Sequence, residues 1–469
     1  MTQVTLEEGV VERLRADFGA RAVTPDDNDY ETARAVWNGT VDARPAIVAR
    51  CKSTADVQSV VRLARQTGLP LAVRGGGHNV AGFGTIDGGI VLDLSPMRSV
   101  EVDPAKRLAV VGGGATLGDL DRATQEHGLV APMGVVSKTG VAGLTLSGGL
   151  GWLRRKHGLS IDNLLAAEVV TADGEIRRAG EGKGEDADLL WALRGGGGNF
   201  GVVTSFTFQL HPLGPDVWLT FVLYSLDDAH EVLLGQDRLM RAATEEIAPI
   251  AVLGRVPAVE DFPAELHHAP FAGVLAVYVG PPAEGESATA ALRQLAEPLA
   301  DLSGAMPWVD AQQLLDADYP DGGRYYWKSA NLPALSEQVV DVLVDHANRA
   351  PADHSTIDLW FNGGAIAEVA ETATAFGNRD ALYLVGVEAN WENAADDEAN
   401  VAWARALLAD LEPHGSRGIY LNFAGTPEEA AAAVRAGHTE SYERLTALKA
   451  RYDPENLFRH NQNIPPAGP

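Results

Sequence analysis

Residues 74–82 read RGGGHNVAG and follow an apolar strand predicted at Leu71–Val73. Glycine permits positive φ angles and lets backbone N–H groups approach an anion closely, so this loop can form a pyrophosphate cradle. Two further glycine-rich loops lie at Gly148–Gly151 and Arg194–Gly201. A single such loop is more simply a tight turn, whereas three in one region, one bearing an arginine and a histidine, favour a binding site. Gly75–Gly77 does not open a helix with an acidic residue at the nicotinamide-fingerprint spacing.

Around these loops, short strands and helices alternate as far as Leu213. We predict strands at Ile90–Leu92 and Leu108–Val111, and helices at Thr54–Thr67 and Thr116–His127. The turn Ala172-Asp173-Gly174 predicts a hairpin joining Ala167–Thr171 to Glu175–Arg178. Beyond a boundary at His211–Gly214 the strands become longer, at Val217–Leu223, Gly273–Val279, Ile357–Phe361 and Leu382–Glu388. This second pattern predicts a mixed sheet with helices on one face.

Four long motifs, in this order, resemble the berberine bridge enzyme-like flavoprotein oxidases of the vanillyl-alcohol-oxidase-type superfamily. They are Arg74–Gly82, Gly134–Trp152 (GVVSKTGVAGLTLSGGLGW), Asp188–Phe206 (DLLWALRGGGGNFGVVTSF) and Tyr452–Pro466 (YDPENLFRHNQNIPP). The resemblance is weaker over 214–413, where YYWKS at 325–329 and NGGA at 362–365 carry it.

The resemblance implies an α+β, two-domain FAD-binding fold. Residues 1–213 would form the first part of the FAD-binding domain, residues 214–413 a mixed-sheet substrate domain that covers the flavin ring, and residues 414–469 a return to the FAD-binding domain. We read Tyr442–Pro466 as turn-rich and expect it to fold back on the first region.

The same resemblance implies that His78 bonds covalently to the 8α-methyl carbon of FAD, the alternative being a loop histidine that caps a turn. The further FAD-binding residues that it implies are Arg74, Gly75, Gly76, Gly77, Asn79, Gly82, Gly134, Val136, Ser137, Thr139, Gly140, Gly143, Leu144, Gly148, Gly149, Gly151, Trp152, Gly201, Val202, Val203, Gln462 and Asn463.

Two positions depart from the family pattern. Many relatives carry a second, cysteinyl link to the flavin, but Val136 stands at that position and the single cysteine, Cys51, precedes the first loop. We therefore expect a tether through His78 alone and a more enclosed pocket. Thr139 stands where relatives usually hold an aliphatic residue that controls oxygen access. Its volume predicts open access, and a strand-favouring threonine bonded to its own backbone is an equal alternative.

For the substrate side we expect a general base to take a proton as hydride moves to flavin N5. Period-2 alternation places Asp358, Trp360 and Asn362 on one face of a strand, suited to lining a site, although a solvent-facing surface fits equally. His438 and Tyr442 lie near the position of the family's catalytic tyrosine. The catalytic candidates are thus Asp358, Asn362, His438, Tyr442 and Thr139. Tyr325, Tyr326 and Trp327 would stack on a substrate or, more simply, lie partly in the core.

Composition limits the partners. The formal net charge of -27 disfavours nucleic acid and anionic membranes, which require clustered cations. Met1–Ala20 predicts a charged amphipathic helix without the apolar core of a signal peptide, so the cytoplasm is expected. Cys51, being alone, excludes an internal disulfide, is expected to be buried, and argues against a cysteine metal site. We expect no metal, and a monomer or homodimer.

The resulting functional hypothesis is an FAD-dependent oxidase that oxidises an alcohol, sugar, phenol or specialised metabolite and returns the electrons to molecular oxygen. A flavin-dependent dehydrogenase or monooxygenase is the enzymatic alternative, which the yield of peroxide per product would separate. A non-catalytic FAD- or carbohydrate-binding protein on the same fold is the alternative from another class, and a flavin that no substrate bleaches would favour it.

Overall fold

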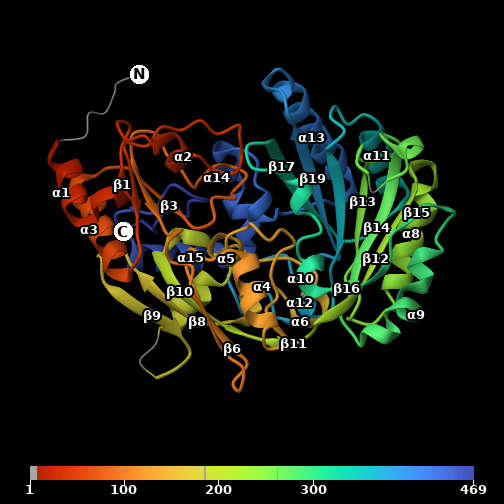
Figure 1. Cartoon of the computed structure of the whole chain (residues 1–469), viewed down its shortest axis with the longest axis horizontal. Coiled ribbons are helices and arrows are strands. Elements are labelled where there is room, and N and C mark those ends of the chain that lie inside the picture. Colours follow the sequence, from red (N-terminus) through yellow and green to blue (C-terminus); the bar gives the residue numbers. More distant parts are fainter. Residues whose placement is uncertain (1–7, 184–185, 261, 469) are drawn as a thin grey trace.

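The computed structural model describes residues 8–183, 186–260 and 262–468. It is an α+β molecule of two domains, with strands β1 to β10 at one end of its long axis and strands β12 to β19 towards the other (Figure 1). Helix α1 (Glu8–Phe18) confirms the described part of the amphipathic helix predicted at the N-terminus, while residues 1–7 lie outside the described ranges. None of the helices in those ranges is long and apolar enough to cross a bilayer.

The first sheet carries the loop at residues 74–82. Its strands lie in the order β1 (Ala22–Val23), β2 (Ile47–Arg50), β4 (Ile90–Asp93) and β3 (Leu71–Arg74). All neighbours except β1 and β2 are parallel, and apolar clusters cover both faces, as parallel sheets require. Helix α3 (Thr54–Thr67) packs on one face, and the Ser53 side chain caps it. The two strands and the helix predicted here are confirmed, and Cys51 is buried beside them.

The second sheet is antiparallel and supplies the strand that ends the glycine loop at Arg194–Gly201. Helix α4 begins after Thr116 with a capping box, which confirms the predicted cap. The hairpin predicted at Ala172–Gly174 is the β8–β9 connection. The elements of this region are β5 (Val100–Asp103), β6 (Leu108–Gly112), α4 (Leu117–Gln125), β7 (Leu129–Val130), α5 (Val141–Leu146), α6 (Arg154–His157), β8 (Leu164–Val170), β9 (Ile176–Gly180), α7 (Ala187–Leu193), β10 (Val202–Gln209) and β11 (His211–Pro212).

The large sheet of the second domain has eight strands among the described residues, and all its neighbouring pairs are antiparallel. The mixed sheet predicted here was therefore wrong in strand direction, which local patterns do not encode. In spatial order the strands are β15 (Pro298–Asp301), β12 (Asp216–Ser225), β14 (Pro270–Tyr278), β13 (Ile250–Arg255), β18 (Thr356–Phe361), β19 (Tyr383–Trp391) and β17 (Arg324–Leu332), with β16 (Gly304–Pro307) beside β12.

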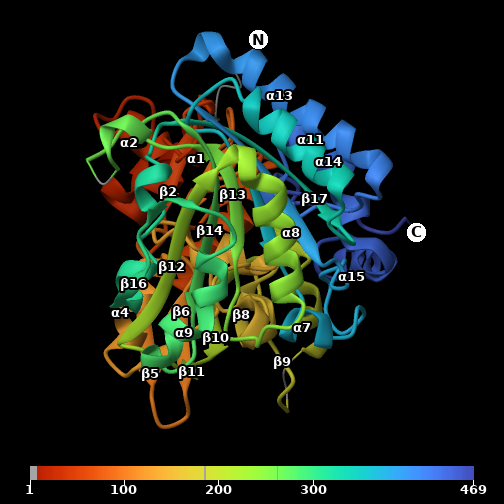
Figure 2. The same cartoon turned by 90° about the vertical axis from the view of Figure 1, so that its right-hand side faces the viewer.

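The short helices α10 (Trp308–Ala311) and α12 (Ala365–Glu368) join the apolar cluster on the inner face of this sheet. The long helices pack on the other face, as predicted. Figure 2 shows them on the outer side: α8 (Ala229–Met240), α11 (Glu337–Asn348) and α13 (Asp397–Leu411). Along β18 the side chains of Ile357, Leu359 and Phe361 pack under these helices. Alternation then directs Asp358 and Trp360 towards the first domain, which confirms the two predicted faces of this strand.

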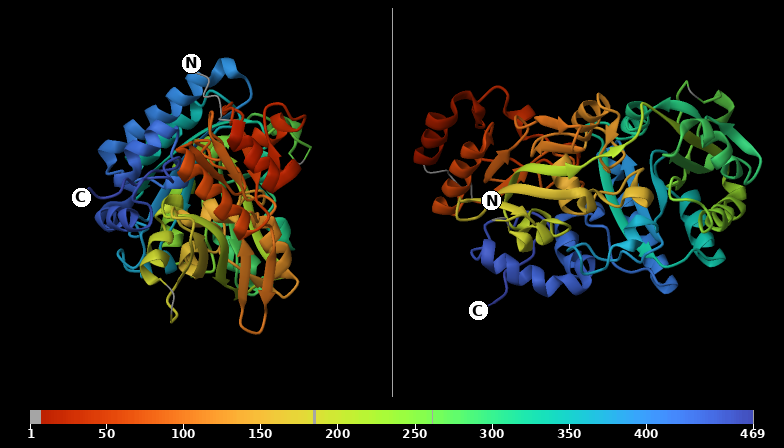
Figure 3. Two further views of the ribbon diagram at one scale, coloured as in Figure 1. Left: turned by 90° about the vertical axis from the view of Figure 1, so that its left-hand side faces the viewer. Right: turned by 90° about the horizontal axis from the view of Figure 1, so that it is seen from below.

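The C-terminal segment returns to the first domain, where Leu445, Leu448 and Tyr452 join its core. Figure 3 shows the helices of this segment, in blue, beside the first half of the chain. The segment is not turn-rich from its start, because α14 (Pro427–His438) is followed by α15 (Tyr442–Tyr452) and turns begin only at Asp453. Leu445 and Leu448, at helical spacing, form the buried face of α15, and the turn residues follow the helix.

A buried ion pair fixes this tail. Lys449 Nζ lies 2.7 Å from Asp453 Oδ2 and donates to the carbonyl oxygens of Asn199 and Phe458, both at 2.8 Å. Asp453 accepts in turn from the backbone N–H groups of Leu457 and Phe458. Because both charges are fully buried and hydrogen-bonded, they hold the tail against the glycine loop at Arg194–Gly201.

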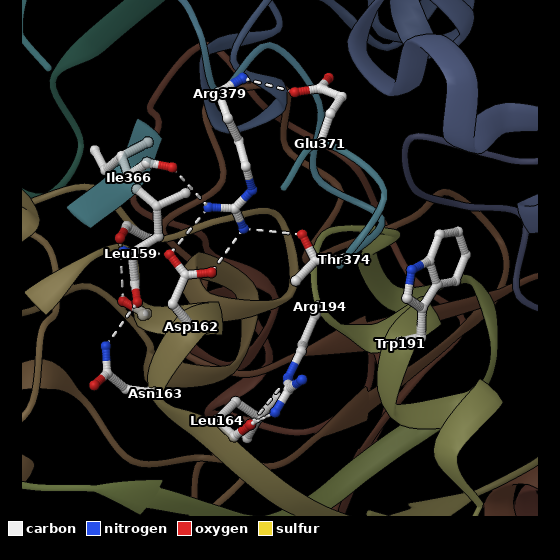
Figure 4. Close-up of polar contacts among 12 residues, drawn as sticks. Leu159, Asp162, Asn163, Leu164, Trp191, Arg194, Ile366, Glu371, Thr374 and Arg379 are labelled. Atoms are coloured by element: carbon white, nitrogen blue, oxygen red, sulfur yellow. Dashed lines mark hydrogen bonds and ion pairs between the residues drawn. The ribbon is translucent and has the colours of Figure 1, made fainter. Parts of the chain in front are cut away.

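Residues 362–382, which we call the docking segment, leave the large sheet between β18 and β19 and pack on the first domain. Within the segment, Arg379 donates to both carboxylate oxygens of Asp162, at 2.6 and 3.1 Å, and to Thr374 Oγ1 at 2.9 Å (Figure 4). The indole of Trp191 donates to the carbonyl of Thr372 at 3.0 Å. These contacts fix β18 and β19 relative to the first domain.

Candidate active site

One continuous cavity lies between the domains. The glycine loops of the first domain line one part of it, and strands β17, β18 and β19 line another. The chain returning towards the C-terminus supplies Tyr420, Asn422 and Phe423. We call the part lined by the glycine loops the glycine wall, and the part lined by Tyr319, Trp327, Asp358, Trp360, Glu388, Tyr420, Asn422 and Phe423 the acidic end.

The glycine wall is made by two backbone segments in direct contact. A Cβ atom added to Gly76 would lie 2.5 Å from the backbone nitrogen of Gly140, so neither loop could close with a side chain there. Gly77 has φ 70°, a left-handed conformation that glycine adopts without strain. Beneath the loop, Arg74 is buried and lies 2.9 Å from Asp93 Oδ2, so its charge is already paired within the protein.

His78 closes the glycine wall on the side of the large sheet. Its ring stacks on Trp37, with centroids 4.0 Å apart and an interplanar angle of 14°. Its Nε2 atom is buried and has no hydrogen-bond partner among the described residues. Burial lowers the pKa of His78 to about 4, so the ring is neutral near pH 7. The imidazole is therefore neutral and lines the cavity, which distinguishes it from a charged surface histidine.

The C-terminal tail completes the wall. Gln462 donates to the carbonyl of Leu421 at 3.0 Å, and Asn461 donates to the carbonyl of Gly198 at 3.2 Å. A ring nitrogen of His460 lies 2.8 Å from the Thr85 carbonyl. The tail thus ties the glycine loop before β10 to the returning chain, and its side chains face the cavity.

The structure places most of the predicted cofactor residues on the cavity. Those that line it are Arg74, Gly75, Gly76, Gly77, His78, Asn79, Gly134, Val136, Thr139, Gly140, Gly143, Leu144, Gly201, Val202, Val203 and Gln462. Lining residues that the sequence analysis did not include are Phe83, Ala142, Ser147, Gly198, Phe458, His460 and Asn461.

Gly148, Gly149 and Gly151 do not line the cavity. The backbone N–H groups of Gly149 and Leu150 donate instead to the hydroxyl oxygen of Tyr420, at 3.1 and 3.2 Å. A Cβ on any of these three glycines would lie less than 3 Å from an atom of another residue. The glycines therefore serve close packing. The loop predicted as an anion cradle therefore holds a tyrosine.

Four other predicted cofactor residues also lie off the cavity lining, and three of them make other contacts that account for this. Ser137 donates through its backbone N–H and its hydroxyl to the Asp316 carboxylate, at 2.7 and 2.5 Å. Trp152 is buried in the core between the domains, and a Cβ on Gly82 would meet the Val41 side chain. Asn463 follows Gln462 but is not among the lining residues.

Two carboxyl groups define the acidic end. Asp358 on β18 and Glu388 on β19 are both buried, and residues Asp358 and Gly386 are paired across the two strands. Tyr319 donates its hydroxyl hydrogen to Glu388 Oε2 at 2.7 Å. The Oδ1 atom of Asp358 has no partner among the described residues. Both carboxyl groups thus lie against the cavity with capacity to accept a proton.

Burial changes the chemistry of this pair. It raises the pKa of Asp358 to about 7, and it raises the pKa of Glu388 well above its usual value, with the charge of Asp358 adding to the effect. No lysine or arginine side chain lines the acidic end in the part of the chain that the structure describes. Arg154 stacks over the far side of the Trp360 ring, 5.1 Å from its centroid, but does not line the cavity.

The remaining catalytic candidates are dispersed. Thr139 lines the cavity on the glycine wall, as expected for a residue near the flavin. Asn362 lies just past the end of β18 and lines a small neighbouring pocket instead. His438 is buried outside the lining, where its Nδ1 atom lies 3.3 Å from the Ala375 carbonyl of the docking segment. Tyr442 starts α15 and packs against the core of the first domain.

Of the three adjacent aromatic residues on β17, one reaches the cavity. Trp327 lines it and donates from its indole to Asn390 Oδ1 at 2.7 Å. Tyr326 points to the other face and donates to the Glu429 carboxylate. Tyr325 stacks on Trp37. Sequence analysis missed Glu388 and Tyr319, although a glutamate inside the apolar run at Tyr383–Trp391 was a usable signal for the former.

The lining of the cavity can be compared with the chemical groups of FAD. The paired glycine loops leave no room for side chains, the Nε2 atom of His78 is unpartnered at the wall, and the adjoining lining is largely apolar. Close backbone approach suits a pyrophosphate, and apolar walls suit a flat ring system. The residues present therefore fit the group.

The chain is similar to known proteins over both of its ends and over nearly its whole length. Residues 45–180 match the family described as FAD binding domain, and residues 420–465 match the family described as berberine and berberine like. An uncharacterised FAD-linked oxidoreductase of Bacillus subtilis (strain 168) is 31% identical, with 95% of this chain and 97% of that protein covered. The (R)-6-hydroxynicotine oxidase of Paenarthrobacter nicotinovorans is 33% identical, with 95% and 96% covered.

A solved structure agrees with these relatives. The crystal structure of 6-hydroxy-D-nicotine oxidase from Arthrobacter nicotinovorans superposes with a TM-score of 0.82 at 32% identity, covering 95% of this chain and 98% of that one. The fold, the two family models and the similarity over nearly the full length all indicate one family. The chain belongs to the berberine bridge enzyme-like family of FAD-linked oxidoreductases.

Proposed function

We propose that this protein is an oxidase with FAD attached covalently through His78 alone, which oxidises a small ring-containing substrate whose proton is taken by the Asp358–Glu388 pair. The observation that carries the proposal is the single cavity in which a glycine wall with an unpartnered His78 nitrogen adjoins two buried, unneutralised carboxyl groups. Neither part alone would indicate a redox site.

The glycine wall would hold the cofactor through its backbone. Gly75, Gly76, Gly77 and Gly140 present main chain to the cavity without side chains in between, and Gln462 and Asn461 add amide groups from the tail. Val136, buried at the wall, offers no thiol, so a second link of the cysteinyl kind is chemically impossible there. FAD, when bound, takes up the hydride of a substrate C–H bond and returns the electrons to an acceptor.

The acidic end would orient the substrate and accept its proton. A carboxylate within hydrogen-bond reach of a substrate O–H or N–H group acts as a general base, and its raised pKa near neutrality matches that task. Tyr319 fixes the orientation of Glu388 by its hydrogen bond. Trp327, Trp360 and Phe423 form apolar walls that suit a ring and exclude water from the acid pair.

The chemistry of this end favours a substrate with a hydrogen-bond donor beside the C–H bond that is oxidised. An alcohol, a sugar, a phenol or an amine meets this requirement, whereas a carboxylate substrate would face two acidic groups without a cation. One relative is named (R)-6-hydroxynicotine oxidase, and the hydroxyl group in that name is a hydrogen-bond donor on a ring, which suits such a pocket.

Substrate-driven bleaching tests this function. The purified yellow protein is mixed anaerobically with benzyl alcohol, a phenol, an oligosaccharide and a hydroxypyridine amine, and the flavin absorbance is followed. We expect at least one class to bleach the flavin, and readmitted air to restore the colour with peroxide formed in step with product. Rapid bleaching without reoxidation by air would instead support a dehydrogenase, and product without matching peroxide would support a monooxygenase. Failure of every class to bleach the flavin would support a binding protein.

Acid precipitation tests the covalent tether separately. Wild-type protein should give a yellow pellet, and peptide mapping should place the flavin on the peptide containing His78. His78→Ala should release all flavin into the supernatant. His438→Ala is the matched control, because His438 is also buried and its pKa is also lowered to about 4, but it does not line the cavity. A colourless wild-type pellet would contradict the tether.

A further inference from the structure

Three aromatic rings form a stack that crosses from one domain to the other. The Trp37 ring lies between His78, at 4.0 Å and 14°, and Tyr325, at 3.8 Å and 10°. His78 belongs to the loop of the glycine wall, whereas Tyr325 belongs to β17 of the large sheet. Trp37 follows helix α2 (Tyr30–Arg34) near the N-terminus. Parallel rings at these separations cover the faces of the imidazole and the tyrosine closely.

Hydrogen bonds fix Trp37 to both domains. Its indole N–H donates to the carbonyl of Tyr319 at 3.0 Å, and its backbone N–H donates to the carbonyl of Gly77 at 3.2 Å. Its carbonyl accepts from the Gly322 N–H at 2.8 Å. The Trp37 ring is buried, and hydrogen bonds hold both its indole N–H and its backbone. Close packing and these bonds together fix the position of the indole.

Asn38 and Gly39 extend the same connection. The Asn38 amide donates to the carbonyls of Val80 and Tyr325, at 2.7 and 2.9 Å, and its oxygen accepts from the Tyr325 N–H at 3.2 Å. Gly39 approaches so closely that an added Cβ would overlap the Gly322 carbonyl oxygen. The segment at residues 37–39 is thus a clamp between the histidine loop and the start of β17.

We propose that the Trp37–Tyr325 stack is the positioning device that fixes the His78 ring for bonding to the flavin, so that attachment requires the large sheet to be docked on the first domain. This inference rests on the covalent FAD proposed above. Trp37 and Tyr325 are positioning residues, because neither lines the cavity. The His78 ring, by contrast, lines the cavity, and Trp37 covers one of its faces.

In the bonding step of this histidine, the lone pair of the unprotonated ring nitrogen forms a C–N bond to the 8α-methyl carbon of the flavin, and one C–H bond of that methyl group breaks. That hydrogen and the hydrogen on the other ring nitrogen leave as protons. The two electrons remain on the isoalloxazine ring until molecular oxygen removes them. The step needs a neutral imidazole, which burial of His78 provides by lowering its pKa.

Loss of the stack should slow attachment more than it weakens FAD binding. A nucleophile displaced by about 1 Å loses on the order of 100-fold in rate, while the backbone cradle that holds the cofactor stays intact. Trp37→Leu keeps an apolar side chain but removes the parallel ring. Trp37→Phe keeps a ring that can stack on both neighbours and is the conservative rescue.

The test measures total flavin and acid-stable flavin in the same preparations of the full chain. Protein is produced under limiting riboflavin, purified, and incubated with excess FAD while samples are precipitated with acid. We expect wild type and Trp37→Phe to become acid-stable at similar rates. Trp37→Leu and Tyr325→Leu should bind FAD but attach it about 10- to 100-fold more slowly. Tyr326→Leu, the control on the other face of β17, should behave as wild type.

The outcomes separate the claims. Attachment at the wild-type rate in both Trp37→Leu and Tyr325→Leu would overturn the positioning role. An equal loss of total and acid-stable flavin in these variants and in Trp37→Phe would also overturn it, because the residue would then serve the fold alone. Should Trp37→Leu fail to fold, Tyr325→Leu decides. Wild-type protein that never retains flavin in acid removes the covalent proposal itself.

Discussion

The two parts of the cavity are built from different materials. The glycine wall is made of backbone: contiguous loops whose missing side chains let main chain meet main chain, with its one arginine already paired to Asp93. The acidic end is made of side chains from β17, β18, β19 and two further segments of the chain, and hydrogen bonds to other side chains hold Glu388 and Trp327 in place. In the proposed function, the backbone conformation of the first part would hold the cofactor, whereas side chains of the second part, which single substitutions can change, would contact the substrate.

The largest effect should come from adding one methyl group to the glycine wall. In Gly76→Ala the new Cβ would lie 2.5 Å from the Gly140 nitrogen, so the two loops must separate. We expect at least an order of magnitude less flavin per protein, with about 1–3 kcal/mol of destabilisation from overpacking. The flavin absorbance per mole of purified protein measures this flavin content. Gly304→Ala is the control, because its Cβ would meet nothing within 4 Å. Undiminished flavin in Gly76→Ala would break the account of this wall.

The glycine wall should dominate the flavin content, whereas the join between the two parts should dominate the stability. Arg379→Met leaves the Asp162 carboxylate buried without its partner, which we expect to cost about 3–5 kcal/mol in the free energy of unfolding. Arg417 pairs with Asp380 of the same docking segment, but both side chains are exposed. Arg417→Met should therefore cost no more than about 1 kcal/mol. Denaturant unfolding of the two variants gives the comparison, and equal losses would show that docking does not depend on the buried pair.

At the acidic end, removal of one hydroxyl should change the pH dependence. The Tyr319 hydroxyl stabilises the ionised form of Glu388, so its loss in Tyr319→Phe raises the pKa of Glu388 further. We expect the acidic limb of anaerobic flavin reduction to move upward by roughly one pH unit, with the rate at high pH nearly unchanged. Tyr383→Phe removes a similar bond, to Asp237 on the other face of the sheet, and should leave the profile alone.

The smallest effect concerns oxygen. Thr139→Leu adds bulk to the glycine wall and should slow reoxidation of the reduced flavin several-fold, while anaerobic reduction by substrate stays close to wild type. Stopped-flow mixing of reduced protein with oxygenated buffer measures the first rate. Thr139→Val keeps the shape and removes the hydroxyl, so any difference between it and wild type reports the hydroxyl alone. Equal slowing of both half-reactions in Thr139→Leu would indicate general distortion instead.

The difference between the two parts also explains what the sequence could predict. Glycine motifs are local, so the loop at Arg74–Asn79 was predicted from the residues themselves, and it lines the cavity. The loop at Gly134–Gly143, which also contributes to the lining, was predicted through the family resemblance. The loop at Gly148–Gly151 shows the limit, because whether its amides meet a phosphate or the Tyr420 hydroxyl depends on a residue about 270 positions away.

Side chains from separate strands are harder to assign. Alternation along β18 predicted the facing of Asp358 correctly, but the strand ends at Phe361, and Asn362 turns into a different pocket. Glu388 joins Asp358 only because Thr356 is paired with Glu388 across β18 and β19, a register that no local pattern contains. His438 resembled a catalytic residue by position, but it contacts the docking segment.

The most direct test of the whole account is the pH profile of anaerobic flavin reduction in wild type and Asp358→Asn, with a substrate found by bleaching. In wild type the rate should rise with pH through about 7, as the coupled Asp358–Glu388 pair loses its proton. Asp358→Asn should lower the rate at high pH by about 10²–10⁴-fold and weaken its rise with pH. Asp121 is a buried carboxyl group outside the cavity, so Asp121→Asn should change neither the rate nor its pH dependence. An Asp358→Asn profile within a few-fold of wild type at every pH would contradict the central claim that the acidic end takes the substrate proton.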